Sequence, residues 1–412
     1  MRILLSEGSG LTSRQVATCL GELGHEVEVL SSTPLCLARF TRHTARVHRV
    51  PPFGAHPLAW LDAAIAVARR RRVEVLLPTQ EQIAVLAASA ARVPVATVVP
   101  PFAALLRVQD KLSASRTLAA LGLPQPRTII ATREDDLGRF DAFPAFVKRP
   151  VSTASSGVRR VVDPAGLLRA GRELGLPARG VVVQAQADGP LVMVQGVADR
   201  GRLVAWHATR RVREGAGGGA AVKESLPHPQ IREHLAALVA GLGWHGAIAL
   251  DAIVTDAGPT YVDVNPRLVE PRNAWLAGVD LVAPMLALAA GGHPVEAAPP
   301  RAGIRSHQLL LAVLEAAARA SAPRRAVARE LLEAARGRGS YEGSVEELTP
   351  ARGDPLAVIP VAVAAAATLL WPPAWRRFVS ASVGAYALTT DGWEELLARA
   401  TAAVARDHAV RG

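Results

Sequence analysis

The N-terminal part of the chain alternates between short apolar runs and helix-like segments, and this alternation constrains the fold most strongly. Apolar runs at residues 2–6, 26–30 and 73–77 are typical of β-strands. Helical patterns lie between them at residues 13–23 and at Pro57–Arg71. Because parallel strands need a crossover connection, usually a helix, this order predicts an α/β fold that begins with a doubly wound parallel sheet.

A polar group follows the last of these apolar runs, before a helical pattern at residues 80–90. Thr79, Gln80 and Glu81 come directly after the run and its closing Pro78. Open α/β sheets bind ligands at the carboxyl ends of their strands, so we expect these residues to contact a substrate. The alternative is that Thr79 only caps the helix. The early GSGLTS segment lacks the GxGxxG pattern, which argues against a dinucleotide site there.

The composition limits the number of domains and the kinds of partner. A chain of 412 residues with 50% hydrophobic residues can form two or three domains. We predict an α/β domain over residues 1–98, a second domain over 99–295 and a mainly helical Ala/Arg-rich extension over 296–412. The net charge of +11 favours acidic partners, but only residues 69–72 form a basic run and aromatic residues make up 4%. We therefore expect no nucleic-acid partner.

The cysteines and the apolar segments bear on the cellular compartment. Cys19 and Cys36 have no CxxC spacing, which favours a reduced, cytoplasmic protein. The N-terminus is typical of a first strand rather than of a signal peptide. Residues 355–370 carry no charge, but they contain Pro360 and fall short of the ~20 residues that a membrane span needs. We interpret them as a buried helix and expect no membrane partner.

Two carboxylates twelve positions apart mark a predicted β-hairpin over residues 246–267. Asp251 ends the apolar run GAIALD, and the alternating run YVDVN follows a turn. Period-two alternation places Tyr261, Asp263 and Asn265 on one face, which Asp251 could oppose in a paired hairpin. Carboxylate and amide oxygens suit Mg²⁺ that bridges substrate phosphates. The alternative is a hairpin with a solvated polar face.

Segments upstream of the hairpin carry features suited to phosphate binding. A capped helix starts at Asp110 and Lys111, and an apolar strand ends at Lys148. The small-residue loop at 152–157 follows that strand, and its backbone N–H groups could bind phosphates. Another apolar strand, at residues 180–187, carries Gln184 and Gln186.

Taken in order, these segments resemble the ATP-grasp superfamily, in the group of carboxylate–amine ligases related to biotin carboxylase and carbamoyl-phosphate synthetase. The resemblance spans residues 1–292. It rests on DKLSASRTLAALGLPQP, FPAFVKRPVSTASSGVRRV, VVVQAQADG and GAIALDAIV…YVDVNPR, in that order. It implies a two-subdomain ATP-grasp core and the use of ATP with Mg²⁺ or Mn²⁺.

The resemblance also implies a role for each matching residue. Lys111 and Lys148 would hold the nucleotide phosphates, and Arg267 would steady the acyl phosphate and its transition state. Arg267 and Lys148 would be the catalytic residues. The remaining residues fall into three groups: a phosphate loop of Ser152, Ser155, Ser156 and Gly157; an adenine-holding segment of Gln184, Gln186 and Ala187; and metal ligands Asp251, Asp263 and Asn265. The sequence departs from the family at Asp263, where glutamate is usual, and at Ala185, where an acidic residue is usual.

Charge arguments support these roles independently. ATP carries about four negative charges, which lysines and a divalent metal offset. The chain has only three lysines, and two of them, Lys111 and Lys148, fall at these points. Phosphoryl transfer needs positioning and charge neutralisation more than a protein nucleophile.

We therefore expect an ATP-dependent ligase that activates a small-molecule carboxylate as an acyl phosphate and joins it to an amine, with a homodimer as a possible assembly. Amino acids or small peptides are the substrates we expect. The alternatives are an inactive ATP-binding sensor or scaffold and an ATP-grasp enzyme that uses bicarbonate or a non-amine nucleophile. His207, Arg210, Arg211 and Lys223 flank the Gly-rich loop at 215–219 and could bind substrate or simply pack; His245 is expected to be structural.

Overall fold

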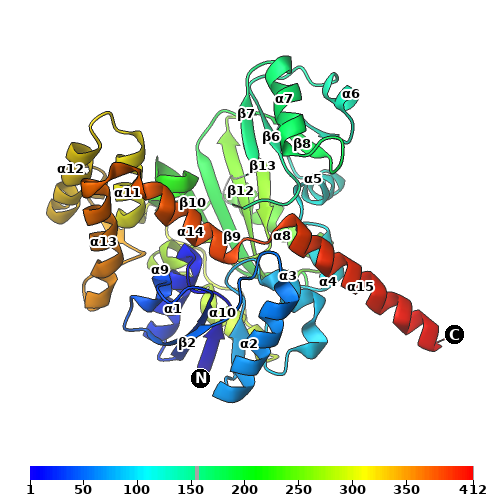
Figure 1. Ribbon diagram of the computed structural model, residues 1–412, viewed down its shortest axis with the longest axis horizontal. Coiled ribbons are helices and arrows are strands. Elements are labelled where there is room, and N and C mark those ends of the chain that lie inside the picture. The colour runs from blue at the N-terminus through cyan, green and yellow to red at the C-terminus, as the bar shows by residue number, and fades with distance from the viewer. Residues whose placement is uncertain (154–156, 412) are drawn as a thin grey trace.

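The computed structural model describes residues 1–153 and 157–411 and contains three β-sheets with helices packed against them (Figure 1). The first sheet is parallel, with the strand order β3-β2-β1-β4. Its strands are β1 (Arg2–Leu5), β2 (Glu26–Ser31), β3 (Thr44–Arg49) and β4 (Val75–Leu77). The predicted parallel N-terminal sheet is confirmed.

Helices connect and cover the strands of this first sheet. They are α1 (Leu11–Glu22), α2 (Pro57–Arg71) and α3 (Ile83–Ala88). Strand β3 was not predicted, because its sequence TARVHR places arginine and histidine where a buried strand has apolar residues. Helix α3 begins later than predicted, and its N-cap is Gln82, so the interpretation of Thr79 as a helix cap was wrong.

The second sheet is antiparallel and has the order β5-β8-β6-β7. Its strands are β5 (Thr128–Ala131), β6 (Ala145–Lys148), β7 (Val158–Val161) and β8 (Val181–Ala185), and its helices are α6 (Glu134–Leu137) and α7 (Pro164–Leu174). Before this sheet lie α4 (Phe102–Leu106) and α5 (Lys111–Ala120). Asp110 caps α5 as predicted, since its side chain accepts a hydrogen bond from the Ser113 N–H at 2.9 Å.

The third sheet has seven strands in the order β13-β12-β9-β10-β11-β14-β15. Its strands are β9 (Leu191–Asp199), β10 (Arg202–Glu214), β11 (Ala220–Ser225), β12 (Gly246–Thr255), β13 (Gly258–Asn265), β14 (Arg305–His307) and β15 (Ser344–Glu346). Helix α8 (Pro229–Leu242) packs on it, and α9 (Arg272–Leu276) and α10 (Val282–Ala289) follow β13. Strands β12 and β13 form the predicted hairpin.

The C-terminal region is mainly helical but also extends the third sheet. Its helices are α11 (Leu309–Arg319), α12 (Pro323–Arg336), α13 (Val358–Leu370), α14 (Trp375–Tyr386) and α15 (Thr390–Arg411). Strand β14 and the edge strand β15 come from the same region, so the boundary near residue 295 does not separate the sheet from the extension. The three domain ranges themselves remain predictions.

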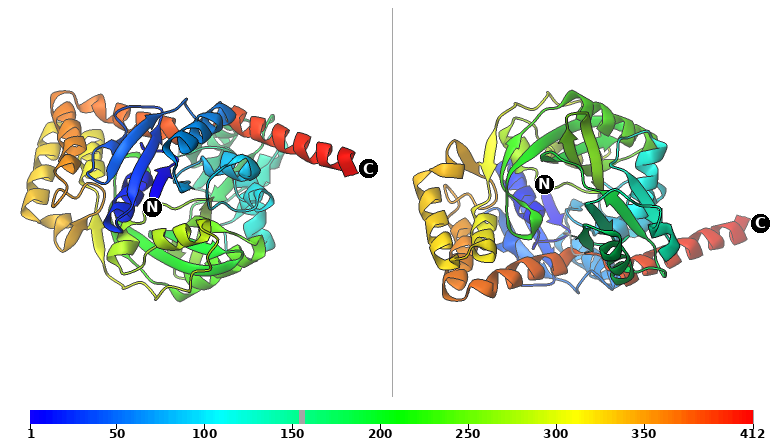
Figure 2. Two further views of the ribbon diagram at one scale, coloured as in Figure 1. Left: turned by 90° about the horizontal axis from the view of Figure 1, so that it is seen from below. Right: turned by 90° about the horizontal axis from the view of Figure 1, so that it is seen from above.

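Helices α14 and α15 run back across the molecule from the C-terminal helices (Figures 1 and 2). The Ser382 hydroxyl in α14 donates to the Ser9 carbonyl at 2.8 Å, just after β1. The Trp393 ring in α15 lies 6.2 Å from the Phe102 ring, centroid to centroid. Helix α14 and the start of α15 are thus held against the N-terminal half of the chain, and the rest of α15 projects away from it (Figure 1).

Helix α13 is buried on only one face, which corrects the interpretation of this segment as a buried helix. Val361, Ala364 and Thr368 are buried, whereas Val363 on the other side is 52% exposed. Within residues 1–153 and 157–411, no helix is long and apolar enough to cross a membrane.

A buried polar cluster joins the N-terminal, central and C-terminal parts. The Lys223 ammonium in β11 pairs with the carboxylates of Glu270 and Glu347, the latter at 2.6 Å. Gln308 donates to both carboxylates, and Gln15 in α1 donates to Glu347 at 3.2 Å. Lys223 is therefore a structural cation, and its pairing with two acids outweighs burial and raises its pKa.

His207 in β10 belongs to the same buried region. Its Nε2 lies 2.8 Å from the Asn273 Oδ1, so this nitrogen carries the proton and donates. Burial lowers the pKa of His207 to about 4, although the Asn273 contact opposes the shift. The structure thus gives His207 a packing role.

We predict that the protein loses stability as the pH falls from about 6.5 to about 4. In this window the unfolded chain binds a proton at residue 207 and the folded chain does not, so the free energy of unfolding rises with pH. His207 contributes up to about 3 kcal/mol to this change. Urea unfolding at several pH values should show a smaller pH dependence for His207→Gln than for wild type. An identical pH dependence in the two proteins would contradict the assignment.

Candidate functional site

The hairpin of β12 and β13 brings the two predicted metal-binding carboxylates directly opposite one another. Asp251 pairs with Asp263 in the strand register, and Ala249 pairs with Asn265. A bulge follows Asp251, so Ala252 pairs with Tyr261 and the register skips Val262. The predicted juxtaposition of Asp251 and Asp263 is therefore confirmed, but the bulge places Tyr261 in the core with Val264, so the prediction that Tyr261 shares a face with Asp263 was wrong.

The two predicted phosphate-binding lysines reach this hairpin from different elements. Lys111, at the start of α5, places its Nζ 3.1 Å from the Asp263 carboxylate. Lys148, at the end of β6, donates to the Val262 carbonyl at 2.6 Å and to the Gln184 Oε1 at 2.7 Å. Residues from the second and third sheets thus meet at one point.

Burial and the neighbouring charges both shift the pKa values of these groups. Burial, and then the like charge of Asp263, raise the pKa of Asp251 to about 6, while Lys111, Arg267 and Lys148 lower it. Burial also lowers the pKa of the Lys148 ammonium to about 8, against the attraction of Asp263. A carboxyl group and an amine with displaced pKa values side by side are typical of a functional site.

Arg267 follows the hairpin and faces the N-terminal sheet. Its Nε lies 4.0 Å from the Oε1 of Glu81, which comes after β4. That Nε is buried and makes no hydrogen bond within the described residues. Glu81 also accepts from the Thr153 hydroxyl at 3.2 Å, and burial raises its pKa. Of the Thr79–Glu81 group, Glu81 is the residue that reaches the other predicted site residues.

The remaining residues of the predicted phosphate loop and adenine-holding segment are only partly described. Ser155 and Ser156 lie outside the described residues. Ser152 and Gly157 approach each other, since a Cβ on Gly157 would lie 2.5 Å from the Ser152 Cβ. Gln184 is engaged with Lys148 and with the Thr128 hydroxyl, so its side chain is not available to a ligand unless these bonds break.

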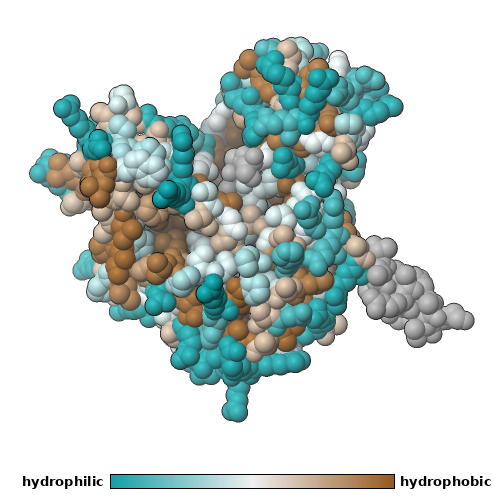
Figure 3. All heavy atoms as spheres, in the orientation of Figure 1, coloured by the Kyte–Doolittle hydropathy of each residue, from teal (hydrophilic) through white to brown (hydrophobic). Residues whose placement is uncertain are grey.

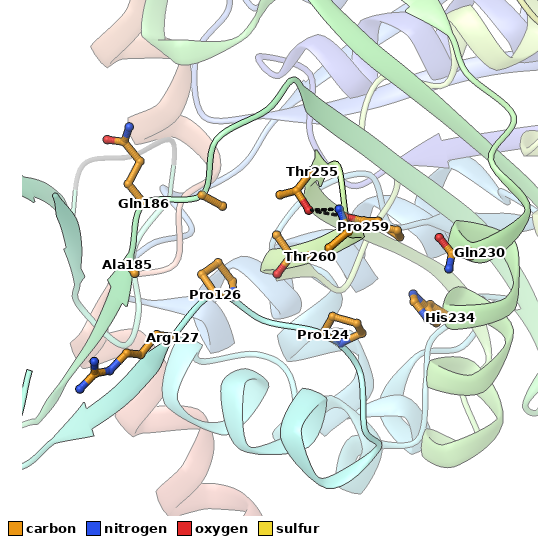
Figure 4. A pocket seen from close by; sticks show the side chains of 13 residues that line it. Pro124, Pro126, Arg127, Ala185, Gln186, Gln230, His234, Thr255, Pro259 and Thr260 are labelled. Carbon is orange, nitrogen blue, oxygen red and sulfur yellow. Dashed lines mark hydrogen bonds between the residues drawn. The ribbon is translucent and has the colours of Figure 1, made fainter. Parts of the chain in front are cut away.

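A pocket of about 450 Å³ lies beside the predicted adenine-holding segment (Figure 4). Gln186 and Ala187 line it on one side, and Thr255 and Gly258 at the tip of the hairpin line it on another. Asp251 is not among its lining residues. The space around Lys111, Lys148 and Asp263 is only about 10 Å³, because these paired side chains fill it.

Tyr386 is a site residue that the sequence did not indicate. It ends α14, in a region where we found no chemical motif. Burial raises the pKa of its hydroxyl to about 12, and the charges of Arg267, Glu7, Glu81 and Glu270 all act on it. A lone tyrosine in an Ala/Arg-rich segment carries no local signal, so only the path of α14 reveals it.

The residues flanking the Gly-rich loop do not gather at this site. Lys223 and His207 are buried in the polar cluster, and Arg210 pairs with Glu224 at 3.0 Å. Arg211 pairs with Glu214 at 3.3 Å. His245 lies 3.5 Å from Asp199 on the far end of the sheet, which agrees with its expected structural role.

We predict that one of the three lysines titrates near pH 8. Lys148 loses its proton there because burial disfavours its charge, whereas Lys223 keeps its charge through two glutamates. Selective ¹³Cε-lysine labelling gives three signals, and the one that shifts near pH 8 should vanish in Lys148→Arg. A spectrum in which every lysine titrates above pH 10 would contradict the geometry around Lys148.

No protein-family model and no curated protein sequence matches the chain. Solved structures do match. The chain is similar to biotin carboxylase from Campylobacter jejuni, with 14% identity and a TM-score of 0.60 over 74% of each chain. It is also similar to N5-carboxyaminoimidazole ribonucleotide synthetase from Thermus thermophilus, with 19% identity and a TM-score of 0.56 over 73% of this chain and 81% of that one.

A third similar structure is the biotin carboxylase domain of 2-oxoglutarate carboxylase from Hydrogenobacter thermophilus. The two share 17% identity with a TM-score of 0.57, over 74% of this chain and 73% of that one. At these identities the similarity establishes the architecture of the chain. The arrangement of the parallel N-terminal sheet, the small antiparallel sheet and the larger sheet that carries Asp251 and Asp263 matches the ATP-grasp fold of these structures.

Proposed function

We propose that the protein is an ATP-dependent ligase that activates a substrate carboxylate as an acyl phosphate and joins it to an amine, releasing ADP and phosphate. One observation carries the proposal. The charges of Lys111, Lys148, Asp263 and Arg267 all act on Asp251, although these residues come from four separate segments. Two acids and three cations at one point match the charge of a metal–nucleotide complex.

The similar structures support the choice of nucleotide and metal. The Campylobacter jejuni biotin carboxylase was solved with a β,γ-ATP ligand, and the Hydrogenobacter thermophilus domain was solved as a dimer with MgADP and bicarbonate. We extend ATP and Mg²⁺ to this chain on the strength of its own residues. A homodimer stays a prediction.

The residues at the hairpin fit a divalent cation. Asp251 and Asp263 repel each other, which together with burial raises the pKa of Asp251 to about 6, and a cation between them would relieve this repulsion. Among the described residues no group of three or more His, Cys, Asp or Glu side chains forms a metal-binding cluster. The two carboxylates and the Asn265 amide would therefore hold Mg²⁺ together with phosphate oxygens, as is usual for this ion. When bound, the ion neutralises charge on the transferred phosphoryl group.

Nucleotide binding requires the present pairing of the lysines to change. Lys111 forms an ion pair with Asp263, and little space surrounds it. We propose that Lys111 and Lys148 turn from the Asp263 carboxylate and the Val262 carbonyl to the phosphates. These exchanges replace one polar partner by another, so the cations stay compensated throughout.

Arg267 is suited to the substrate carboxylate. Its planar guanidinium presents donors in a fork that matches a carboxylate, and its buried Nε has no hydrogen-bond partner among the described residues. Glu81 lies beside Arg267 on the side that faces the N-terminal sheet, and the charges of both residues act on Tyr386. We propose that this side receives the substrate and that its amino group, in an amino acid or small peptide, is recognised by Glu81.

We predict that Asp251→Asn lowers substrate-dependent ADP release by about a hundredfold or more, since electrostatic groups at a phosphoryl-transfer centre typically contribute factors of this size. Asp256→Asn, at the turn of the same hairpin, is the matched control and should keep wild-type activity. The measurement is ADP release across pairs of amino acids, with bicarbonate tested separately.

The outcomes of this assay separate the alternatives. Turnover that needs both a carboxylate and an amine supports the ligase, and mass spectrometry of the product identifies the joined pair. Turnover with bicarbonate alone indicates the carboxylating alternative. Tight ATP binding without turnover in any mixture would reject the ligase in favour of the sensor.

We also predict that Tyr386→Phe raises KM for the carboxylate substrate roughly 10- to 100-fold and leaves KM for MgATP unchanged. A hydrogen bond to a charged group typically contributes about 1.5–3 kcal/mol, and the charges of Arg267 and Glu81 act on the Tyr386 hydroxyl. Tyr341→Phe, a buried tyrosine in the C-terminal region, is the control. Equal changes in both KM values would show that Tyr386 acts on folding or closure and not on substrate binding.

A further inference from the structure

Helix α13 and the residues beside it expose an unusual amount of apolar surface. Six large apolar side chains within residues 356–371 are more than one-third exposed. They are Leu356 at 44%, Val358 at 46%, Ile359 at 38%, Val363 at 52%, Leu370 at 80% and Trp371 at 49%. Figure 3 shows this apolar ridge along α13.

The spacing of these residues places most of them on one face. Ile359, Val363 and Leu370 follow one another in α13 at intervals of four and seven residues, which align on an α-helix, and Leu356 lies in the 3-10 turn just before it. The opposite face packs against α11 and α12. The helix is therefore apolar all round, and one of its apolar faces has no cover among the described residues.

Cations gather at the C-terminal end of this ridge. Arg324 donates to the carbonyls of Leu369 and Leu370, at 2.7 and 3.1 Å. The Arg377 guanidinium lies 5.0 Å from the centre of the Trp371 ring. In the part of the chain that the structure describes, Arg324 and Arg377 form no ion pair with an acidic side chain, and neither does Arg376.

Acidic residues do not offset these cations. The sequence from residue 355 to residue 374 contains no charged side chain. On the neighbouring helices, Glu315 pairs with Arg319, Glu330 with Arg213 and Glu333 with Arg329. The ridge therefore combines aliphatic side chains, a half-exposed tryptophan and unpaired arginines.

We propose that this ridge, residues 356–371 with Arg324, Arg376 and Arg377, attaches the protein peripherally to an anionic membrane surface. Aliphatic side chains can enter the boundary between headgroups and acyl chains, tryptophan favours that boundary, and arginine binds lipid phosphates. The net charge of +11 adds long-range attraction. The 13-residue helix lies on the bilayer, since it is too short to cross it.

Charge also argues against a second copy of the chain as the occupant of this face. In a two-fold symmetric contact the same patch meets itself. The arginines near Trp371 would then approach their own counterparts with no acid between them. An anionic lipid surface offers the opposite charge.

The test is sedimentation of the full chain with vesicles of phosphatidylcholine alone and with vesicles that also contain phosphatidylglycerol. We expect binding only to the anionic vesicles, and weaker binding as salt is raised. Arg376→Gln with Arg377→Gln should weaken it roughly 25-fold, because each arginine near an anionic surface contributes a factor of about 5. Arg46→Gln with Arg49→Gln, in β3, is the matched control for net charge.

The apolar part is tested by Leu370→Ser with Trp371→Ser, against Leu35→Ser with Val295→Ser, which are also exposed but lie elsewhere. Only the first pair should abolish vesicle binding, with circular dichroism and thermal unfolding unchanged in both. Equal losses in the two pairs, binding to neutral vesicles, or no binding to either kind would overturn the proposal. So would concentration-dependent dimerisation that Leu370→Ser disrupts in the absence of lipid. None of these outcomes depends on ligase activity.

Discussion

The buried cluster around Lys223 is the interaction on which the arrangement of the molecule depends. One ammonium group compensates two carboxylates, Glu270 from the loop after the hairpin and Glu347 after the edge strand β15. Gln15 adds the N-terminal domain to the same cluster. Removing one partner of a buried ion pair typically costs about 3–5 kcal/mol, because the other charge stays buried. The cluster therefore fixes the three regions relative to one another, and it holds Glu270 only three positions from Arg267.

The hairpin site is electrostatically the reverse of this cluster. In the cluster the two carboxylates share one ammonium group and also accept hydrogen bonds from neutral side chains, whereas Asp251 and Asp263 lie opposite each other and are compensated by cations from other elements. Such an arrangement is unfavourable for the isolated protein, and a cation with a polyphosphate would relieve it. Lys223 therefore has a structural role, whereas Lys111 and Lys148 can exchange their present partners for those of a ligand.

The C-terminal region contributes more than its composition indicates. It supplies β14 and the edge strand β15, the buried acid Glu347, the tyrosine on which the charge of Arg267 acts, and an apolar helix face beside unpaired arginines. Its helices α14 and α15 return across the carboxyl-end side of the first sheet (Figure 2). A change in the C-terminal region could therefore affect the site and the apolar ridge together, although the two proposals are tested separately.

The sequence by itself determined the features that depend on local patterns. These are the strand–helix order of the first sheet, the cap at Asp110, and the hairpin whose alternation places Asp263 and Asn265 on one face. Each of them depends on residues close together in the chain, because strands repeat every 2 residues and helices every 3.6. Only the tertiary structure decided that Lys111 meets Asp263, that Glu81 and Tyr386 approach Arg267, that Lys223 is structural, and that α13 leaves one apolar face open. Each of these features depends on residues that are far apart in the chain. Such residues are brought together by the packing of whole helices and sheets, so a local sequence pattern cannot predict their contacts.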